Sequence, residues 1–324
     1  MSASSHPFSL TQPSGRRPTV EWPTLAVAAA VYGSWTGLTL WHEAIPAFAL
    51  VPLAAWTIAW HSSLQHEILH GHPTRWRGLN RALAAMPLSL WIPFERYRRL
   101  HLAHHRDERL TDPIDDPESA YWTIEEWVGL GPLGRALVRA QTTLAGRLLI
   151  GPAWSIGRFL RSETKAARGD PALAAIWARH GAGVAALLAS LWLVCDLTPW
   201  AYAALFVYPG TSLLLVRSFA EHRADEGVER RTAVVEGSPL LALLFLNNNL
   251  HAAHHAQPAL PWYRLPAWYR ANRAALLARN GGLVYAGYGD VARRYLFAPH
   301  DRPTHPSDRA PTRETVGVNG TASS

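Results

Sequence analysis

Three short histidine clusters constrain this chain more than any other feature of its sequence. They are His66-Glu-Ile-Leu-His70, His101-Leu-Ala-His104-His105 and His251-Ala-Ala-His254-His255. On a helix, residues three and four positions apart share a face, so each cluster points its imidazoles in one direction. Imidazole is a common ligand of iron, copper and zinc. Eight imidazoles exceed what one tetrahedral zinc ion needs, so the clusters predict a site for two metal ions.

Apolar residues gather in blocks beside these clusters. They make up 48% of the 324 residues, and charged residues make up only 17%, below the soluble norm of about 25%. The run from Thr24 to Trp41 suffices for a helix of roughly 27 Å, about one bilayer core. A second run starts at Pro46 and can continue as a helix through the first cluster, and two more cover 174–195 and 199–216. The blocks predict an all-α integral membrane protein with about four transmembrane helices in two hairpins.

The distribution of arginine predicts how the chain is oriented. The two hairpin turns, near Glu43 and Asp196, contain no Lys or Arg, whereas the N-terminal segment, residues 61–170 and the chain after Arg217 are Arg-rich. The positive-inside rule places these three regions in the cytoplasm. We therefore expect an inner-membrane protein with both termini cytoplasmic and a cytoplasmic helical cap that carries all three clusters. The net charge of +7 suits anionic lipid headgroups, and we expect no nucleic acid partner.

The remaining segments are shorter or more polar. The run Ala82–Ile92 is too short to cross a bilayer and predicts a re-entrant or interfacial helix. Arginines alternate with apolar residues from Leu133 to Leu160, which predicts basic amphipathic helix on the membrane surface. Residues 1–22 and 301–324 are polar and Pro-rich, so we expect disordered tails on either side of one domain, 23–300.

Other interpretations explain less of the histidine pattern. The first cluster alone matches a zinc protease signature with Glu67 as general base, but that leaves both HxxHH clusters unexplained. A single HxxHH is compatible with a polar helix face, whereas two of them plus HxxxH on one side of the membrane favour a metal site. A membrane protein that binds or moves metal without redox chemistry is the rival from another class. A transporter would place polar ligands midway through its spans, whereas these clusters lie beyond the spans.

The order of the clusters resembles a known family. HxxxH, then HxxHH about thirty residues later, then HxxHH after a further pair of spans resembles the integral-membrane fatty acid desaturase superfamily. That group also contains lipid and alkane hydroxylases and carotenoid ketolases. The resemblance covers roughly Trp41 to Tyr269, and Asn249-Leu-His-Ala-Ala-His-His followed by Pro261-Trp-Tyr-Arg-Leu-Pro266 is especially similar to bacterial members.

The resemblance implies a site, a cofactor and a reaction. It implies two iron ions held by histidines, adds His222 by its position after the fourth span, and does not imply Glu67 as a ligand. The expected ligands are His66, His70, His101, His104, His105, His222, His251, His254 and His255. The implied reaction is oxygen-dependent desaturation of fatty acyl chains, with hydroxylation or ketolation of lipids, alkanes or carotenoids as the alternative. Because the single Cys195 cannot hold an iron–sulfur cluster, we expect a ferredoxin- or rubredoxin-type protein to donate the electrons.

Polar residues near the clusters are candidates for supporting roles. Asn247 lies four residues before His251, so on a helix it shares that face and either contacts a ligand or ends an apolar run. Asp112, with Asp115 and Asp116, either orients imidazoles or satisfies the backbone of a Pro-Asp turn. We expect no metal at the other histidines considered, which are His6, His42, His61, His72, His300 and His305. His61 and His72 flank the first cluster and either support its ligands or pack at the membrane interface.

Overall fold

The computed structural model describes residues 10–13 and 18–306 of the chain. Helices dominate these residues, as expected, but the described part also contains one small parallel sheet. It pairs β1 (Val234–Val235) with β2 (Val284–Tyr285). Most of the two expected tails lies outside the described residues. The part of the second tail that is described contacts the domain, because the Tyr121 hydroxyl donates a hydrogen bond to Asp301 over 2.7 Å.

Three helices are long and apolar enough to cross a membrane. They are α2 (Ala47–Leu69), α9 (Pro171–Cys195) and the helical segment Pro199–Glu221, which consists of α10 (Pro199–Tyr202), a π-helical turn (Ala203–Val207) and α11 (Tyr208–Glu221). The first expected run forms α1 (Trp22–Leu40), a helix of 19 residues. It is not among the three candidates, so length and composition identify three spans where the sequence predicts about four.

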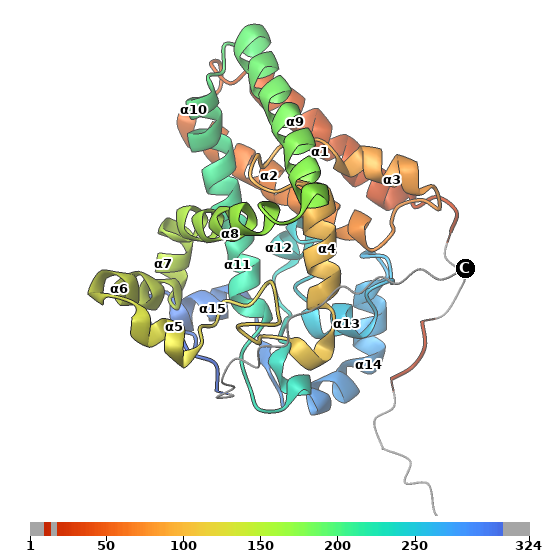
Figure 1. Ribbon diagram of the computed structural model, residues 1–324. Coiled ribbons are helices and arrows are strands. Elements are labelled where there is room, and N and C mark those ends of the chain that lie inside the picture. Colours follow the sequence, from red (N-terminus) through yellow and green to blue (C-terminus); the bar gives the residue numbers. More distant parts are fainter. Residues whose placement is uncertain (1–9, 14–17, 307–324) are drawn as a thin grey trace, which may run out of the picture.

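These helices form a bundle around α2. Both α1 and α11 pack against α2. In Figure 1, α1, α2 and α9 lie in the upper part of the molecule, and α11 runs from there down past its middle. One buried apolar cluster joins Leu38, near the end of α1, to Leu191, Leu197 and Tyr202 around the turn between α9 and α10. Ile45, in the turn between α1 and α2, packs against the same cluster. The two turns therefore lie at the same end of the bundle.

A chain of shorter helices connects α2 to α9. It comprises α3 (Arg77–Ala84), α4 (Phe94–His104), a 3-10 turn (Asp107–Arg109), α5 (Ile124–Gly129), α6 (Pro132–Gln141), α7 (Leu144–Leu149) and α8 (Gly151–Ala167). The basic stretch Leu133–Leu160 thus forms three helices. A sharp corner separates the first two, where Thr143 accepts the Gly146 N–H at 3.1 Å. A Cβ atom at Gly146 would lie 1.9 Å from the Ala140 carbonyl oxygen, so this corner requires glycine.

The C-terminal third packs below the bundle in Figure 1. It contains a 3-10 turn (Val228–Arg231), α12 (Pro239–Leu244), α13 (His251–Ala256), α14 (Leu265–Arg279) and α15 (Tyr288–Tyr295). Helix α13 is only one and a half turns long, and tertiary contacts hold it in place. Its Ala252 N–H donates to Ala233 at 3.0 Å, and Ala253 is fully buried against Leu265 and Trp268 of α14.

Candidate metal centre

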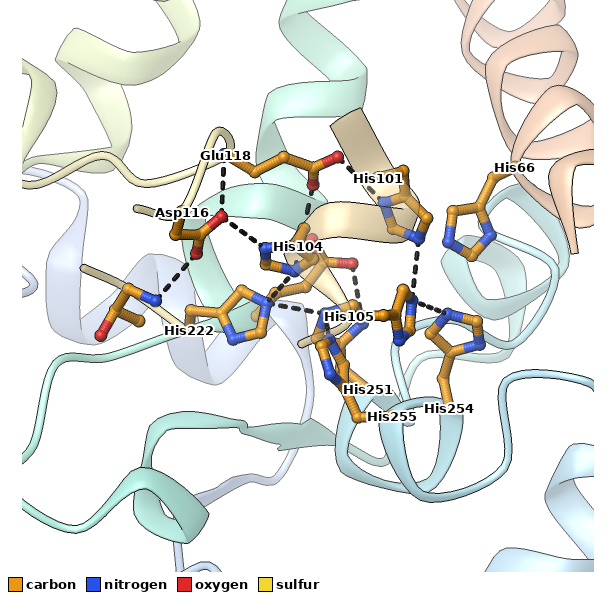
Figure 2. Close-up of polar contacts among 12 residues, drawn as sticks. His66, His101, His104, His105, Asp116, Glu118, His222, His251, His254 and His255 are labelled. Atoms are coloured by element: carbon orange, nitrogen blue, oxygen red, sulfur yellow. Dashed lines mark hydrogen bonds and ion pairs between the residues drawn. The ribbon is translucent and has the colours of Figure 1, made fainter. Parts of the chain in front are cut away.

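Helix ends bring the three histidine clusters together. His66 lies in the last turn of α2, and His70 follows that helix directly. His101 and His104 lie in the last turn of α4, with His105 immediately after it. The third cluster occupies α13 (Figure 2). His222, the ninth expected ligand, follows the end of α11.

The nine histidines fall into two compact groups. The first group contains His66, His70, His101, His105 and His254, and the second contains His104, His222, His251 and His255. Within each group, one nitrogen from every residue lies within 4.8 Å of the others. Each HxxHH cluster is divided between the groups, because its i and i+4 residues go to one group and its i+3 residue to the other. The helical spacing therefore predicts that the histidines of each cluster point the same way. In the structure, each HxxHH cluster contributes ligands to both groups.

The inner ring nitrogens are spaced as the ligand atoms of a metal ion would be. In the second group, His222 Nε2 lies 3.1 Å from His104 Nε2 and 2.9 Å from His251 Nε2. In the first group, His105 Nε2 lies 2.9 Å from His101 Nε2 and 3.1 Å from His254 Nε2. For metal–nitrogen bonds of about 2.1 Å at right angles, neighbouring nitrogens would lie about 3 Å apart. The nitrogens present fit two metal ions of this kind.

The outer ring nitrogens of several of these histidines face hydrogen-bond acceptors. His101 Nδ1 lies 2.9 Å from Glu118 Oε1, and His104 Nδ1 lies 2.9 Å from Asp116 Oδ1 (Figure 2). His251 Nδ1 lies 3.0 Å from Asn248 Oδ1, and His222 Nδ1 lies 3.2 Å from the Arg231 carbonyl oxygen. An Nδ1–H that donates outward leaves the Nε2 lone pair pointing inward, as metal-binding histidines require.

Burial keeps most of these imidazoles neutral. It lowers the pKa of His251, His254 and His255 well below the usual value, and repulsion from neighbouring histidines lowers it further. Burial also lowers the pKa of His104, but Glu118 and Asp116 outweigh it and raise the pKa to about 9. The site without metal therefore holds a proton at His104, in a position where a cation is already favoured by two carboxylates.

Of the supporting residues expected from the sequence, Asp116 contacts a histidine of the site, whereas Asn247 and Asp112 form other contacts. Asn247 has a left-handed φ of 58° and lies outside α13, and its side-chain amide donates to the Trp262 carbonyl at 3.0 Å. The next residue, Asn248, contacts His251 instead. Asp112 accepts the N–H groups of Ile114 and Asp115, as the turn interpretation predicts.

Three carboxylates contact histidines of the two groups, and their signals in the sequence differ. Asp116 belongs to the acidic turn that suggests imidazole-orienting groups, and it is the member that contacts His104. Glu118 has no such signal, because its partly buried contact with His101 at 2.9 Å depends on how the turn folds back over α4. Glu221, one residue before His222, lies 3.2 Å from His251 Nδ1 and pairs with Arg217 over 2.9 Å.

The other histidines lie outside the two groups. His72 is fully buried, and its Nδ1 lies 2.8 Å from Glu21 Oε1. Glu21, Glu67 and His72 form a third buried cluster of possible ligand atoms. Glu67 also accepts the Trp262 N–H at 3.0 Å and belongs to neither histidine group. A zinc protease would instead place this glutamate beside the metal that the two histidines of its motif bind. His61 contacts Tyr32 over 3.4 Å, His300 lies 2.8 Å from the Tyr285 hydroxyl, and His305 lies 3.0 Å from the Thr111 hydroxyl. His6 lies outside the described residues.

A cavity of about 440 Å³ reaches the second group. His222, Asp116 and Glu118 line it on the metal side, and large apolar side chains line much of the rest, among them Trp91, Ile92, Leu100, Phe159, Leu214 and Leu215. Its volume is within the range of ligand sites, about 300–1,000 Å³. An apolar chain can therefore lie beside the candidate metal centre.

Comparison with known proteins agrees with this site. The family model described as fatty acid desaturase matches residues 43–287, which is well over half of the chain and includes all nine histidines. Comparison with curated proteins finds no match. The family is one of lipid-modifying oxidoreductases, and the three apolar helices fit the membrane setting that it implies. The chain belongs to the fatty acid desaturase family.

Proposed function

We propose that this protein is an oxygen-dependent di-iron enzyme that desaturates the acyl chain of a membrane lipid. Two groups of imidazoles, with five and four members, supply enough neutral nitrogen ligands for two iron ions. Iron bound there would supply oxygen activation and removal of hydrogen from an unactivated C–H bond. The observation that carries the proposal is the division of nine buried or half-buried histidines between two adjacent groups within a chain of this family.

The side chains around the groups hold the ligands and the substrate in place. Asp116 and Glu118 orient His104 and His101 through their outer nitrogens, so these rings do not need to reorganise when metal binds. The apolar wall of the cavity aligns an extended acyl chain and keeps water away from the reacting carbons. The placement of that chain decides whether a second hydrogen is lost, which gives an alkene, or whether a hydroxyl group is added.

The proposal includes an orientation in the inner membrane. The histidine groups lie at the end of α2 away from the turn between α1 and α2, and that turn lies beside the turn between α9 and α10. Both turns lack Lys and Arg, which supports a periplasmic position for them and a cytoplasmic position for the metal centre and both termini. A soluble electron donor would then meet the protein on its Arg-rich cytoplasmic face.

Lipid analysis tests this function directly. Acyl chains would be compared between cells that express the protein and cells that express the His105→Ala variant, with and without oxygen. His180→Ala is the matched control, because His180 lies on α9 and contacts the Leu90 carbonyl rather than the metal centre. We expect a new double bond only with oxygen and only in the wild type and the control. A hydroxylated or ketolated lipid would show that the protein catalyses the alternative reaction rather than desaturation. Unchanged lipids under all conditions would contradict both reactions.

A further inference from the structure

Two arginines face the cavity without an ionic partner. The cavity that His222 lines is also lined by Arg147 of α7 and by Arg158 of α8. Among the described residues, no carboxylate forms an ion pair with either guanidinium, whereas Arg217, which also lines the cavity, is paired with Glu221. The two cations repel each other, and burial lowers the pKa of Arg147 to about 10. Arg147 nevertheless remains charged at neutral pH.

The contacts of these arginines orient them without neutralising them. Arg147 Nε donates to the Gln141 carbonyl at 3.1 Å, and its guanidinium carbon lies 5.9 Å from the centre of the Phe219 ring. The guanidinium carbon of Arg158 lies 4.5 Å from the centre of the Trp122 ring. Arg147 is half-buried, whereas Arg158 is exposed to water, so the cost of removing a charge from water falls mainly on Arg147. A neutral acceptor and a ring face offset only part of that cost.

The carboxylates near the arginines are engaged elsewhere. Asp301 accepts hydrogen bonds from the Tyr121 hydroxyl and the Arg302 N–H, both over 2.7 Å. Glu126 influences the pKa of Arg158, but its side chain is exposed and belongs to the capping box of α5. The carboxylates on the metal side contact His101, His104 and Arg217. The cavity therefore combines an apolar wall, a histidine of the metal centre and uncompensated positive charge.

We infer that Arg147 and Arg158 bind the anionic headgroup of the lipid substrate while its acyl chain lies along the apolar wall that leads to His222. The inference rests on the proposed function and adds the chemical class of its substrate. Guanidinium groups bind phosphate and carboxylate oxygens through paired hydrogen bonds, and two of them suit a group with several anionic oxygens. The substrate would be an amphiphile that carries a phosphate or a carboxylate, rather than an uncharged alkane or carotenoid.

Equilibrium binding tests the inference without turnover. The purified protein would be kept free of oxygen and mixed with three lipids that share one acyl chain: a phosphate monoester, a carboxylate and an uncharged glycerol ester. We expect at least one anionic lipid to bind about tenfold more tightly than the uncharged one, since a hydrogen bond to a charged group contributes about 1.5–3 kcal/mol. The comparison between the phosphate and carboxylate arms identifies which anionic group the site prefers.

Variants assign the preference to the two arginines. Arg147→Gln and Arg158→Gln should each remove most of it, and Arg158→Lys should retain part of it. Arg161→Gln and Arg139→Gln are the controls, because both side chains are exposed, as that of Arg158 is, but neither lines the cavity. The wild-type comparison needs no variant, so a folding defect cannot hide the result.

Two outcomes would overturn the inference. One is equal affinity of the wild type for all three lipids, and the other is a preference for anionic lipids that persists in both glutamine variants. If cells that express the protein still form desaturated lipids, either of these binding results would reject the headgroup site and leave the proposed function intact. A clear preference for anionic lipids in a protein that forms no oxidised product would instead retain the binding site and reject the proposed function.

Discussion

The Asp116 carboxylate lies 2.9 Å from His104 Nδ1, and both side chains are only 2% exposed. The carboxylate is itself fixed, because it accepts the backbone N–H groups of Thr111 at 2.8 Å and Glu118 at 2.9 Å. A short acidic turn thus holds one imidazole of the second group in a set orientation, with Nε2 directed at His222 (Figure 2).

Asp116→Asn should weaken iron binding by about 10- to 100-fold, the usual effect of removing a carboxylate behind a metal-binding histidine. The amide keeps the shape of the side chain but loses the negative charge that favours a cation at His104. Asp115→Asn is the control, since Asp115 is 46% exposed and pairs with Arg109 instead. Titration of both purified variants with ferrous iron measures the effect, and equal affinities would show that Asp116 has only a structural role in its turn.

Single alanine substitutions at His104, His105, His254 or His255 should abolish activity and reduce bound iron. The protein should still accumulate in the membrane, because these residues lie at helix ends outside the apolar bundle. Immunoblots of membranes, iron analysis and lipid analysis of the same cells check the three parts. Full activity in a chain with any two of these changes would refute the assignment of the site.

The sequence predicts the histidine ligands of the candidate metal centre better than it predicts the side chains that contact those histidines. Helical spacing is a local property, so the shared faces of His101 with His105 and of His251 with His255 follow from the chain itself. The contact of Asn248 does not, because Leu246 and Asn247 adopt left-handed conformations that end the helical register before α13 begins. Likewise, Glu118 meets His101 only because the acidic turn folds back over α4, which depends on tertiary packing.

The apolar segments show the same division between local and tertiary information. The extension of α2 through His66 follows from an apolar run that leads directly into the first cluster. The break of the basic stretch at Thr142 and Thr143 depends instead on a close approach of Gly146 to Ala140, which residue spacing does not reveal. The small sheet that supports α13 joins strands fifty residues apart with two residues each, too short for a period-2 pattern to be recognised.

Reporter fusions should place both hairpin turns outside the cytoplasm. The absence of Lys and Arg from the turns near Glu43 and Asp196 gives this orientation, and both turns pack against one apolar cluster at the same end of the bundle. A fusion after residue 306 should report from the cytoplasm and serves as the internal control. Cytoplasmic signals from both turns would reverse the proposed topology.

Sustained turnover should require an external electron donor. The single Cys195 cannot hold an iron–sulfur cluster, and oxygen activation at two irons consumes two electrons beyond those of the substrate. The purified protein with iron, oxygen and lipid should therefore turn over at most once, and a ferredoxin or rubredoxin with its reductase should restore multiple turnovers. The stimulation should weaken as salt rises, because an acidic donor would meet an Arg-rich face. Many turnovers with no donor present would point to non-redox chemistry.

The number of iron ions per chain tests the two-group site most directly. Purified wild-type protein should contain two irons, and His70→Ala/His105→Ala, which removes two ligands from the first group, should contain one. His222→Ala/His255→Ala, which removes two ligands from the second group, should also contain one, whereas His180→Ala should retain two. Metal analysis combined with protein quantification gives these values. One metal ion or none in the wild type, or two irons retained in both double variants, would contradict the assignment of nine histidines to two iron sites.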